Sequence, residues 1–192
     1  MMISLRLSTI LIVGLFALGP WAAGVVAFEE ALVLRGTTMG TTYQVKIAPP
    51  PETSPTSLKA RIDQRLAAIN QGMSLYQADS EINRINASDK GQVIVVSSDL
   101  GQVLQVTKRL HRVTGGALDP TVGPLVALWG FGRGEPRRNV PAAAEIEAAL
   151  AMVGFDHIEL IDRRRLRKRI AAVTLDLGAI AKGYGVDQVA AL

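Results

Sequence analysis

The stretch of residues 114–132, TGGALDPTVGPLVALWGFG, constrains the fold more than any other part of the chain. Its glycine pair, Gly115-Gly116, is predicted to end the amphipathic segment before it, because glycine readily adopts a positive φ. Proline fixes φ, so Asp119-Pro120 is expected to form a sharp corner. An apolar and aromatic patch follows, made of Leu125, Leu128, Trp129 and Phe131. Two interpretations are open: a helix end packed on the core, or an acid beside glycines and an aromatic wall that binds a flat polar ligand.

Length and composition set wide bounds. The 192 residues are enough for one sizeable domain or a fragment of a larger protein, and they can bury a core without crosslinks. The absence of cysteine excludes disulfides, thiol nucleophiles and cysteine-ligated metals. With only two histidines in the chain, a zinc site is not expected.

The net charge of +4 comes from one short run of six basic residues within residues 163–169. Without this run, acidic side chains outnumber basic ones, so no nucleic-acid partner is expected. The run contains no aromatic residue for base stacking. It is predicted to be a solvated hairpin; the alternative is a contact with phosphate or acidic lipid.

Residues 1–27 are typical of a secretory signal peptide. Arg6 supplies a positive start, residues 9–18 form an apolar block, and VVA at residues 25–27 offers small residues for cleavage. The apolar block is short for a transmembrane helix, although a retained N-terminal anchor is the alternative. Without cysteine the chain is not expected to be a lipoprotein. The sequence predicts export to the periplasm, a mature domain of residues 28–192, and membrane association only through an uncleaved signal.

The first half of the mature chain alternates short β-type and helical patterns. Residues 32–47 read as two strands around Gly36 and Gly40, either a hairpin or one strand with a bulge. Met39, at this bend, either fills the core or lies on a ring system. A helix is predicted for residues 56–74, capped at residue 56 or 57. Tyr76, at the junction before a short helix ending near residue 86, either faces a pocket or is buried.

The last third ends in a strand-to-helix turn. Residues 157–161 and 172–175 are predicted to be strands on either side of the basic run. Asp176 then precedes a glycine and a helix that carries Lys182. A helix N-terminus and a lysine both favour negative charge, so this turn is predicted to face phosphate. Neither a Walker A pattern nor GxGxxG is present.

Four blocks in this order, GTTMGT, MSLYQADSEINRIN, TGGALDPTVGPLVALWGFG and DLGAIAKGYGVD, resemble the ApbE family of FAD:protein FMN transferases. The similarity covers essentially everything after the predicted signal. It implies an α+β, T-fold-like domain with mixed helices on an antiparallel sheet, of which the chain would hold the N-terminal portion only. In that family FAD lies between the N-terminal strand region and the α+β body, and Mg²⁺ sits on its pyrophosphate.

The resemblance also implies roles for individual residues. Met39 and Tyr76 would contact the flavin ring, and Ala117, Leu118 and Asp119 would line the cofactor site. Asp176 and Lys182 would hold FAD, and the Ala179 carbonyl would bind magnesium, which prefers hard oxygen ligands. Family members normally continue well beyond residue 192 with the remaining metal ligands and the general base. The chain is therefore expected to be a truncated product, a fragment or part of a split protein, with no catalytic base of its own.

The implied reaction moves FMN from FAD to a threonine or serine hydroxyl of a target protein and releases AMP. Expected partners are exported flavin-accepting subunits of membrane redox complexes. Two alternatives stay open for the same site: a non-catalytic FAD-binding protein, and a hydrolase that splits FAD into FMN and AMP. A basic membrane-surface module on residues 163–169 is a further alternative of another class.

Overall fold

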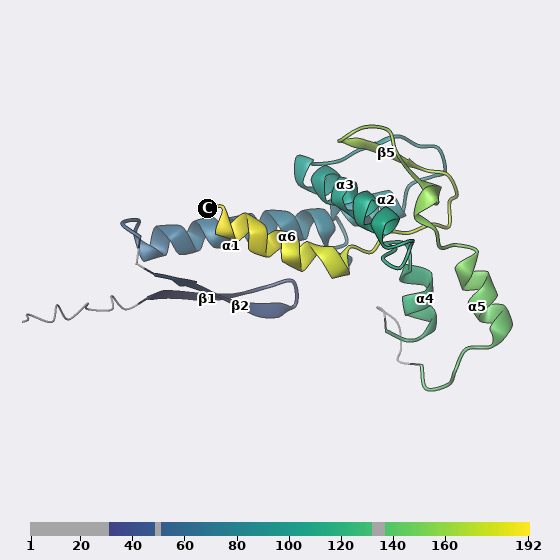
Figure 1. The fold of residues 1–192 in the computed structure, drawn as a ribbon, viewed down its shortest axis with the longest axis horizontal. Helices are drawn as coiled ribbons and strands as arrows, with labels where there is room; N and C mark the ends of the chain where they lie inside the picture. Colours follow the sequence, from purple (N-terminus) through teal and green to yellow (C-terminus); the bar gives the residue numbers. More distant parts are fainter. Residues whose placement is uncertain (1–30, 49–50, 132–136) are drawn as a thin grey trace, which may run out of the picture.

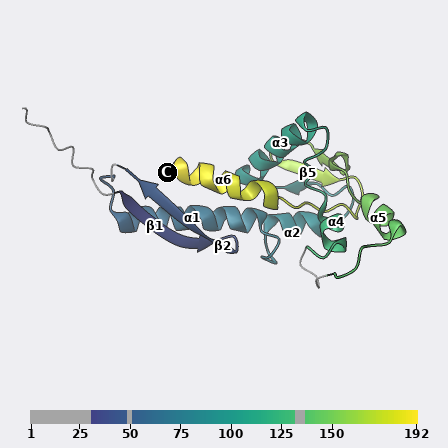
Figure 2. The ribbon, with the colours of Figure 1, turned by 60° about the horizontal axis from the view of Figure 1, so that its bottom comes forward.

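The computed structural model describes residues 31–48, 51–131 and 137–192, so the predicted signal peptide lies outside the described residues. The chain forms an elongated α+β body with two small antiparallel sheets, as the sequence predicts (Figure 1). A two-stranded hairpin lies along two helices at one end, and a three-stranded sheet with the remaining helices forms the other end (Figure 2). The elements in order are β1 (Leu32–Thr38), β2 (Thr41–Ile47), α1 (Pro55–Met73), α2 (Glu81–Asn86), β3 (Ile94–Val95), α3 (Ser98–Val113), α4 (Gly123–Leu128), α5 (Ala143–Leu150), a 3₁₀ turn (Phe155–His157), β4 (Ile158–Leu160), β5 (Arg165–Lys168) and α6 (Gly178–Ala190).

The hairpin of β1 and β2 has a two-residue loop, so the hairpin and not the single bulged strand is the structure adopted. Met39 and Gly40 both have positive φ, 49° and 71°, which matches the twist that short hairpin loops require. A lone two-stranded hairpin is marginal in water. Tyr43 ties it to α1: its ring covers Gly36 on the opposite strand, and its hydroxyl donates to Asp63 at 2.5 Å.

Helix α1 is the central support of the fold. Its apolar face enters both buried clusters, one under the hairpin and one beneath α2 and α3. The helix begins at Pro55 without a side-chain cap, so the predicted cap at residue 56 or 57 is wrong. Proline needs no hydrogen bond at the first helical position, which explains the earlier start.

A polar network joins α1, α3 and α6. The Arg65 guanidinium donates to both carboxylate oxygens of Asp99, and its Nη2 also donates to Gln188 at 2.6 Å. The Tyr184 hydroxyl donates to the same carboxylate at 2.8 Å. The hydrogen bond from Arg65 holds the pKa of Asp99 below its ordinary value. Three helices far apart in sequence are thereby fixed to one another (Figure 2).

The basic run forms the β4–β5 turn and strand β5, in the antiparallel order β3-β5-β4. Most of its arginines are exposed and paired with acids of the same hairpin, such as Arg167 with Glu159, so the solvated-hairpin prediction is confirmed for them. Lys168, in the same basic run, is not part of the solvated surface, because it is only 1% exposed. The predicted strand at residues 172–175 is wrong: these residues, all within the described part of the chain, belong to no strand.

Candidate functional site

A cleft of about 900 Å³ opens where the hairpin tip meets the helical body. Its walls come from the hairpin loop, the end of α1, residues 74–77, helix α4, residues 174–176 and the first turns of α6. A concave, mostly apolar space of this size with a few polar groups is typical of small-molecule sites. The cleft is thus the natural place to locate the residues predicted from sequence.

Three large side chains are among the apolar residues that line the cleft. Met39 reaches it from the hairpin loop, where a positive φ in a residue other than glycine costs about 1 kcal/mol or more. Tyr76 and Phe131 also line it and are 80% and 81% exposed. Exposed aromatic rings beside a cleft mark a surface on which a flat ligand can stack. Sequence reasoning placed Phe131 in an aromatic patch but did not assign it to the site.

Two charged groups lie at the α6 end of the cleft. Asp176 Oδ1 accepts from the Gly178 backbone N–H at 2.8 Å, so this carboxylate sits on the first turn of α6. The backbone N–H of Asp176 donates to Pro120 O at 2.7 Å, and this bond fixes the Asp176 backbone. Lys182 lies about one turn further along α6, is exposed, and also lines the cleft. The cation and the amino end of the helix together suit an anionic group such as phosphate.

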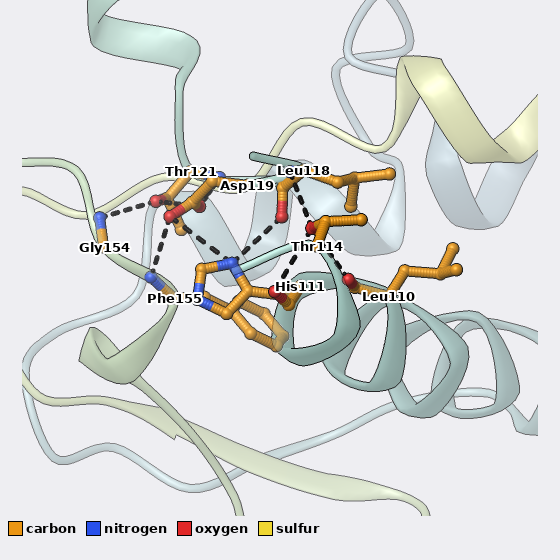
Figure 3. A network of polar contacts seen from close by, with 8 residues as sticks. All are labelled: Leu110, His111, Thr114, Leu118, Asp119, Thr121, Gly154 and Phe155. Atoms are coloured by element: carbon orange, nitrogen blue, oxygen red, sulfur yellow. Dashed lines mark hydrogen bonds and ion pairs between the residues drawn. The ribbon is translucent and has the colours of Figure 1, made fainter. Parts of the chain in front are cut away.

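Ala117, Leu118 and Asp119 are not among the residues that line the cleft. The carboxylate of Asp119 is turned toward its own chain: Oδ1 accepts from the Thr121 backbone N–H at 2.7 Å and from the Thr121 hydroxyl at 2.5 Å. Oδ2 accepts from the Phe155 N–H at 3.3 Å (Figure 3). Asp119 therefore locks the corner that leads into α4, and flavin contact by residues 117–119 stays a prediction.

The same corner is tied to the end of α3. His111 Nδ1 lies 2.9 Å from Leu118 O and 3.8 Å from Asp119 Oδ2, and its ring packs on Phe155 with centroids 5.6 Å apart (Figure 3). Thr114 accepts from the Leu118 N–H at 3.1 Å. Since α4 starts directly after this corner and lines the cleft, the network fixes one wall without touching the cavity.

The fit to magnesium is incomplete in the described residues. Ala179 is exposed on the first turn of α6, beside Gly178 of the cleft lining. Asp176 is the one acidic side chain among the described residues that line the cleft. Within the same described ranges, no three His, Cys, Asp or Glu side chains are grouped so that they could hold a metal. These side chains do not make a magnesium site by themselves.

The model of the ApbE family matches residues 39–192. The chain belongs to the ApbE family. Relatives named FAD:protein FMN transferase include those of Vibrio cholerae, 42% identical over 84% of this chain and 48% of the relative, and Haemophilus influenzae, 41% identical over 84% and 48%. The protein from Escherichia coli K12 with the same name is 34% identical.

Solved ApbE structures agree with this fold. The flavin transferase ApbE from Vibrio cholerae superposes with a TM-score of 0.80 at 40% identity, covering 84% of this chain and 52% of that one. The apo flavinyl transferase ApbE from Pseudomonas stutzeri gives 0.76 at 32% identity, over 85% and 55%. The chain thus spans about half the length of the ApbE relatives it matches. Family membership and the α+β fold are confirmed; the residue roles remain predictions.

Sequence reasoning also missed Asn83 and Asn86, which line the cleft from α2. The segment EINRIN places them three residues apart, with Ile82 and Ile85 fully buried on the adjacent face of the helix. Two asparagines at that spacing share one side of a helix. Because asparagine is a poor helix former, the pair was the available signal of a specific role.

Proposed function

We propose that this chain provides the FAD-binding half of an FAD:protein FMN transferase. The observation that carries the proposal is the convergence of Met39, Tyr76, Asp176 and Lys182 on one cleft from three distant parts of the sequence. These are four of the seven residues that the family resemblance associates with the flavin ring and with FAD. The names of the relatives from Vibrio cholerae and Haemophilus influenzae support the same activity.

The reaction we propose joins the FMN phosphate of FAD to a threonine or serine hydroxyl of a target protein. The hydroxyl oxygen forms a bond to the FMN-side phosphorus, the pyrophosphate P–O bond breaks, AMP leaves, and the hydroxyl proton passes to a base. No described residue of this chain is assigned as that base. Met39, Tyr76 and Phe131 supply the wall for the ring, and Lys182 supplies positive charge for the phosphates.

We propose that this chain supplies only some of the ligands for magnesium. When bound it would neutralise charge on the pyrophosphate, and the Ala179 carbonyl and Asp176 would lie nearest to it in this chain. The remaining oxygen ligands would have to be water, phosphate or groups other than the described side chains. Loss of metal is accordingly expected to affect transfer more than FAD affinity.

We further propose that the protein is exported and acts in the periplasm on flavin-accepting subunits of membrane redox complexes. The supporting features are the positive, apolar and small-residue pattern of residues 1–27 and the family resemblance. In the described part of the chain no helix is long and apolar enough to cross a membrane.

The first test is an FAD titration of this chain followed by flavin fluorescence, beside Lys182→Ala and the exposed control Lys108→Ala on α3. We expect saturable binding, weakened about tenfold by Lys182→Ala because a charge-assisted contact is lost, and unchanged by Lys108→Ala. No saturable signal up to about 1 mM FAD would overturn the proposal.

The second test adds Mg²⁺ and an acceptor domain, and measures AMP and a fluorescent protein band. A band with equimolar AMP supports transfer by the chain itself. AMP without an acceptor identifies a hydrolase, and binding with neither product identifies a non-catalytic FAD-binding chain.

A further inference from the structure

We propose that Asn83 and Asn86 of α2 are positioning residues that hold two walls of the cleft in a fixed relation. One asparagine fixes the loop that carries Tyr76, and the other fixes the segment that carries Asp176. The identification of the ligand as a flavin nucleotide rests on the proposed function. The holding of the walls rests on hydrogen bonds alone.

Asn83 holds the Tyr76 wall through its side-chain amide. Its Nδ2 donates to Gln77 O at 2.7 Å and to Leu75 O at 3.0 Å, on either side of Tyr76. The loop is also held by the Ser74 hydroxyl, which accepts from the Tyr76 N–H at 3.1 Å. One side chain thus bonds two carbonyls of an irregular loop, and the Gln77 carbonyl also accepts from the Ser80 N–H at 3.1 Å.

Asn86 holds a second wall at Leu175. Its Nδ2 donates to Leu175 O at 3.0 Å, and its Oδ1 accepts from the Leu175 N–H at 2.7 Å. An amide side chain here pairs with both backbone groups of one residue, as a neighbouring strand would. Leu175 is 1% exposed, so its polar groups are shielded from water and need these partners. Asp176 follows directly, and its own N–H is bonded to Pro120 O.

Helix α2 is itself held firmly enough to serve this purpose. Ser80 caps its start by accepting from the Asn83 N–H, and Ile82 and Ile85 are fully buried. At its end, the buried Lys168 ammonium donates to Asn86 O at 2.9 Å. Carbonyls in the last turn of a helix lack helical partners. The lysine bonds one of them and so holds the backbone of Asn86 in place. Both rotation and end position of the helix are therefore fixed.

Since both asparagines belong to one six-residue helix, the Tyr76 loop and the Asp176 segment cannot shift independently of each other. A ligand that contacts both walls then meets a preformed site and loses little affinity to reorganisation. Removing either asparagine is expected to loosen one wall and leave the other in place.

The test begins without ligand, by backbone hydrogen–deuterium exchange of the chain and its variants. We expect Asn83→Ala to raise exchange in residues 74–78 only, and Asn86→Ala in residues 173–177 only. Arg84→Ala, an exposed change on the same helix, should alter neither. Asn86→Asp keeps the acceptor for the Leu175 N–H but loses the donor, and should give the same local pattern if Asn86→Ala fails to fold. Faster exchange across the whole chain, or no local change, would overturn the proposal.

FAD titration then links the walls to binding. Each asparagine-to-alanine change should weaken FAD about tenfold, the equivalent of losing one or two net hydrogen bonds. In a Tyr76→Ala background, Asn83→Ala should cost no further affinity, because it acts through Tyr76. Additive losses would contradict a positioning role. If the unaltered chain binds no FAD, the proposed function fails, while the exchange pattern still decides whether the asparagines hold the walls.

Discussion

Two helical glycines offer a sharp test of how the body behind the cleft is packed. Gly101 lies in α3 against the turn between β4 and β5, and a Cβ added there would lie 2.0 Å from Arg163 O. A carbon and a carbonyl oxygen normally stay at least about 3.3 Å apart. That oxygen belongs to the backbone, so the turn would have to move by about 1 Å. Gly183 lies exposed in α6, and a Cβ there would meet nothing within 4 Å.

The same substitution should therefore have opposite effects at the two positions. At Gly183, alanine should stabilise the protein by about 1 kcal/mol through helix propensity alone. At Gly101 that gain is opposed by overpacking of about 3 kcal/mol, since displacing the turn strains the bonds between Val96 and Arg164. The expected net loss is about 2 kcal/mol.

Urea denaturation followed by far-UV circular dichroism measures both variants on one scale. We expect the midpoint to fall for Gly101→Ala and to rise for Gly183→Ala, with the denaturant slope unchanged. A Gly101→Ala midpoint equal to or above that of the unaltered chain would refute the packing of α3 on the β4–β5 turn. A lower urea midpoint for Gly183→Ala would refute the presence of open space beside Gly183 on α6.

Three further predictions concern the supports of the cleft and its wall. Asp99→Asn should lower the free energy of unfolding by about 2 kcal/mol, because Arg65 loses its charged acceptor. Since Arg65 holds the pKa of Asp99 below 3.8, this stabilisation is present above that pH and is lost as pH falls through the folded pKa; acid unfolding curves of the variant should lack this component. Tyr43→Phe removes the hydrogen bond to Asp63 and should lower the urea midpoint by the equivalent of about 1 kcal/mol. Phe131→Ala should weaken FAD about tenfold in a fluorescence titration and leave the melting temperature unchanged, because the ring is 81% exposed.

The parts of the fold predicted correctly are those specified by neighbouring residues. Gly40 beside Met39 favours a positive-φ loop, and the polar–apolar alternation on either side leads to the hairpin that is observed. The family blocks likewise placed Met39, Tyr76, Asp176 and Lys182 near one ligand, and all four line one cleft. Local chemistry was sufficient for the hairpin loop, whereas the grouping of these four residues came from the family resemblance.

The strand prediction that failed depends on a partner far away in sequence. Residues 172–175 have the composition of a strand, but Leu175 pairs with the side chain of Asn86, 89 residues earlier, and not with another strand. The role of Asp119 is a separate case, because flavin contact by this residue stays a prediction. An acid near two glycines has the same local pattern whether it faces a ligand or its own backbone. The Asp119 carboxylate is oriented by the N–H groups of Thr121 and Phe155. The contact with Phe155, 36 residues further along the chain, cannot be predicted from the local sequence.

These distant partners explain why the predicted site residues meet at all. Helix α1 contacts β1, α2, α3 and α6, and thereby connects the elements that carry Met39, Asn83, Asn86 and Lys182. Ile69 on this helix is fully buried in the main core cluster and also lines the cleft. The floor of the cleft is therefore part of the core, and its shape is fixed by the same packing that stabilises the fold. The exposed rings of Tyr76 and Phe131 thus form part of the wall surface, whereas the position of the cleft is set by the packing of α1.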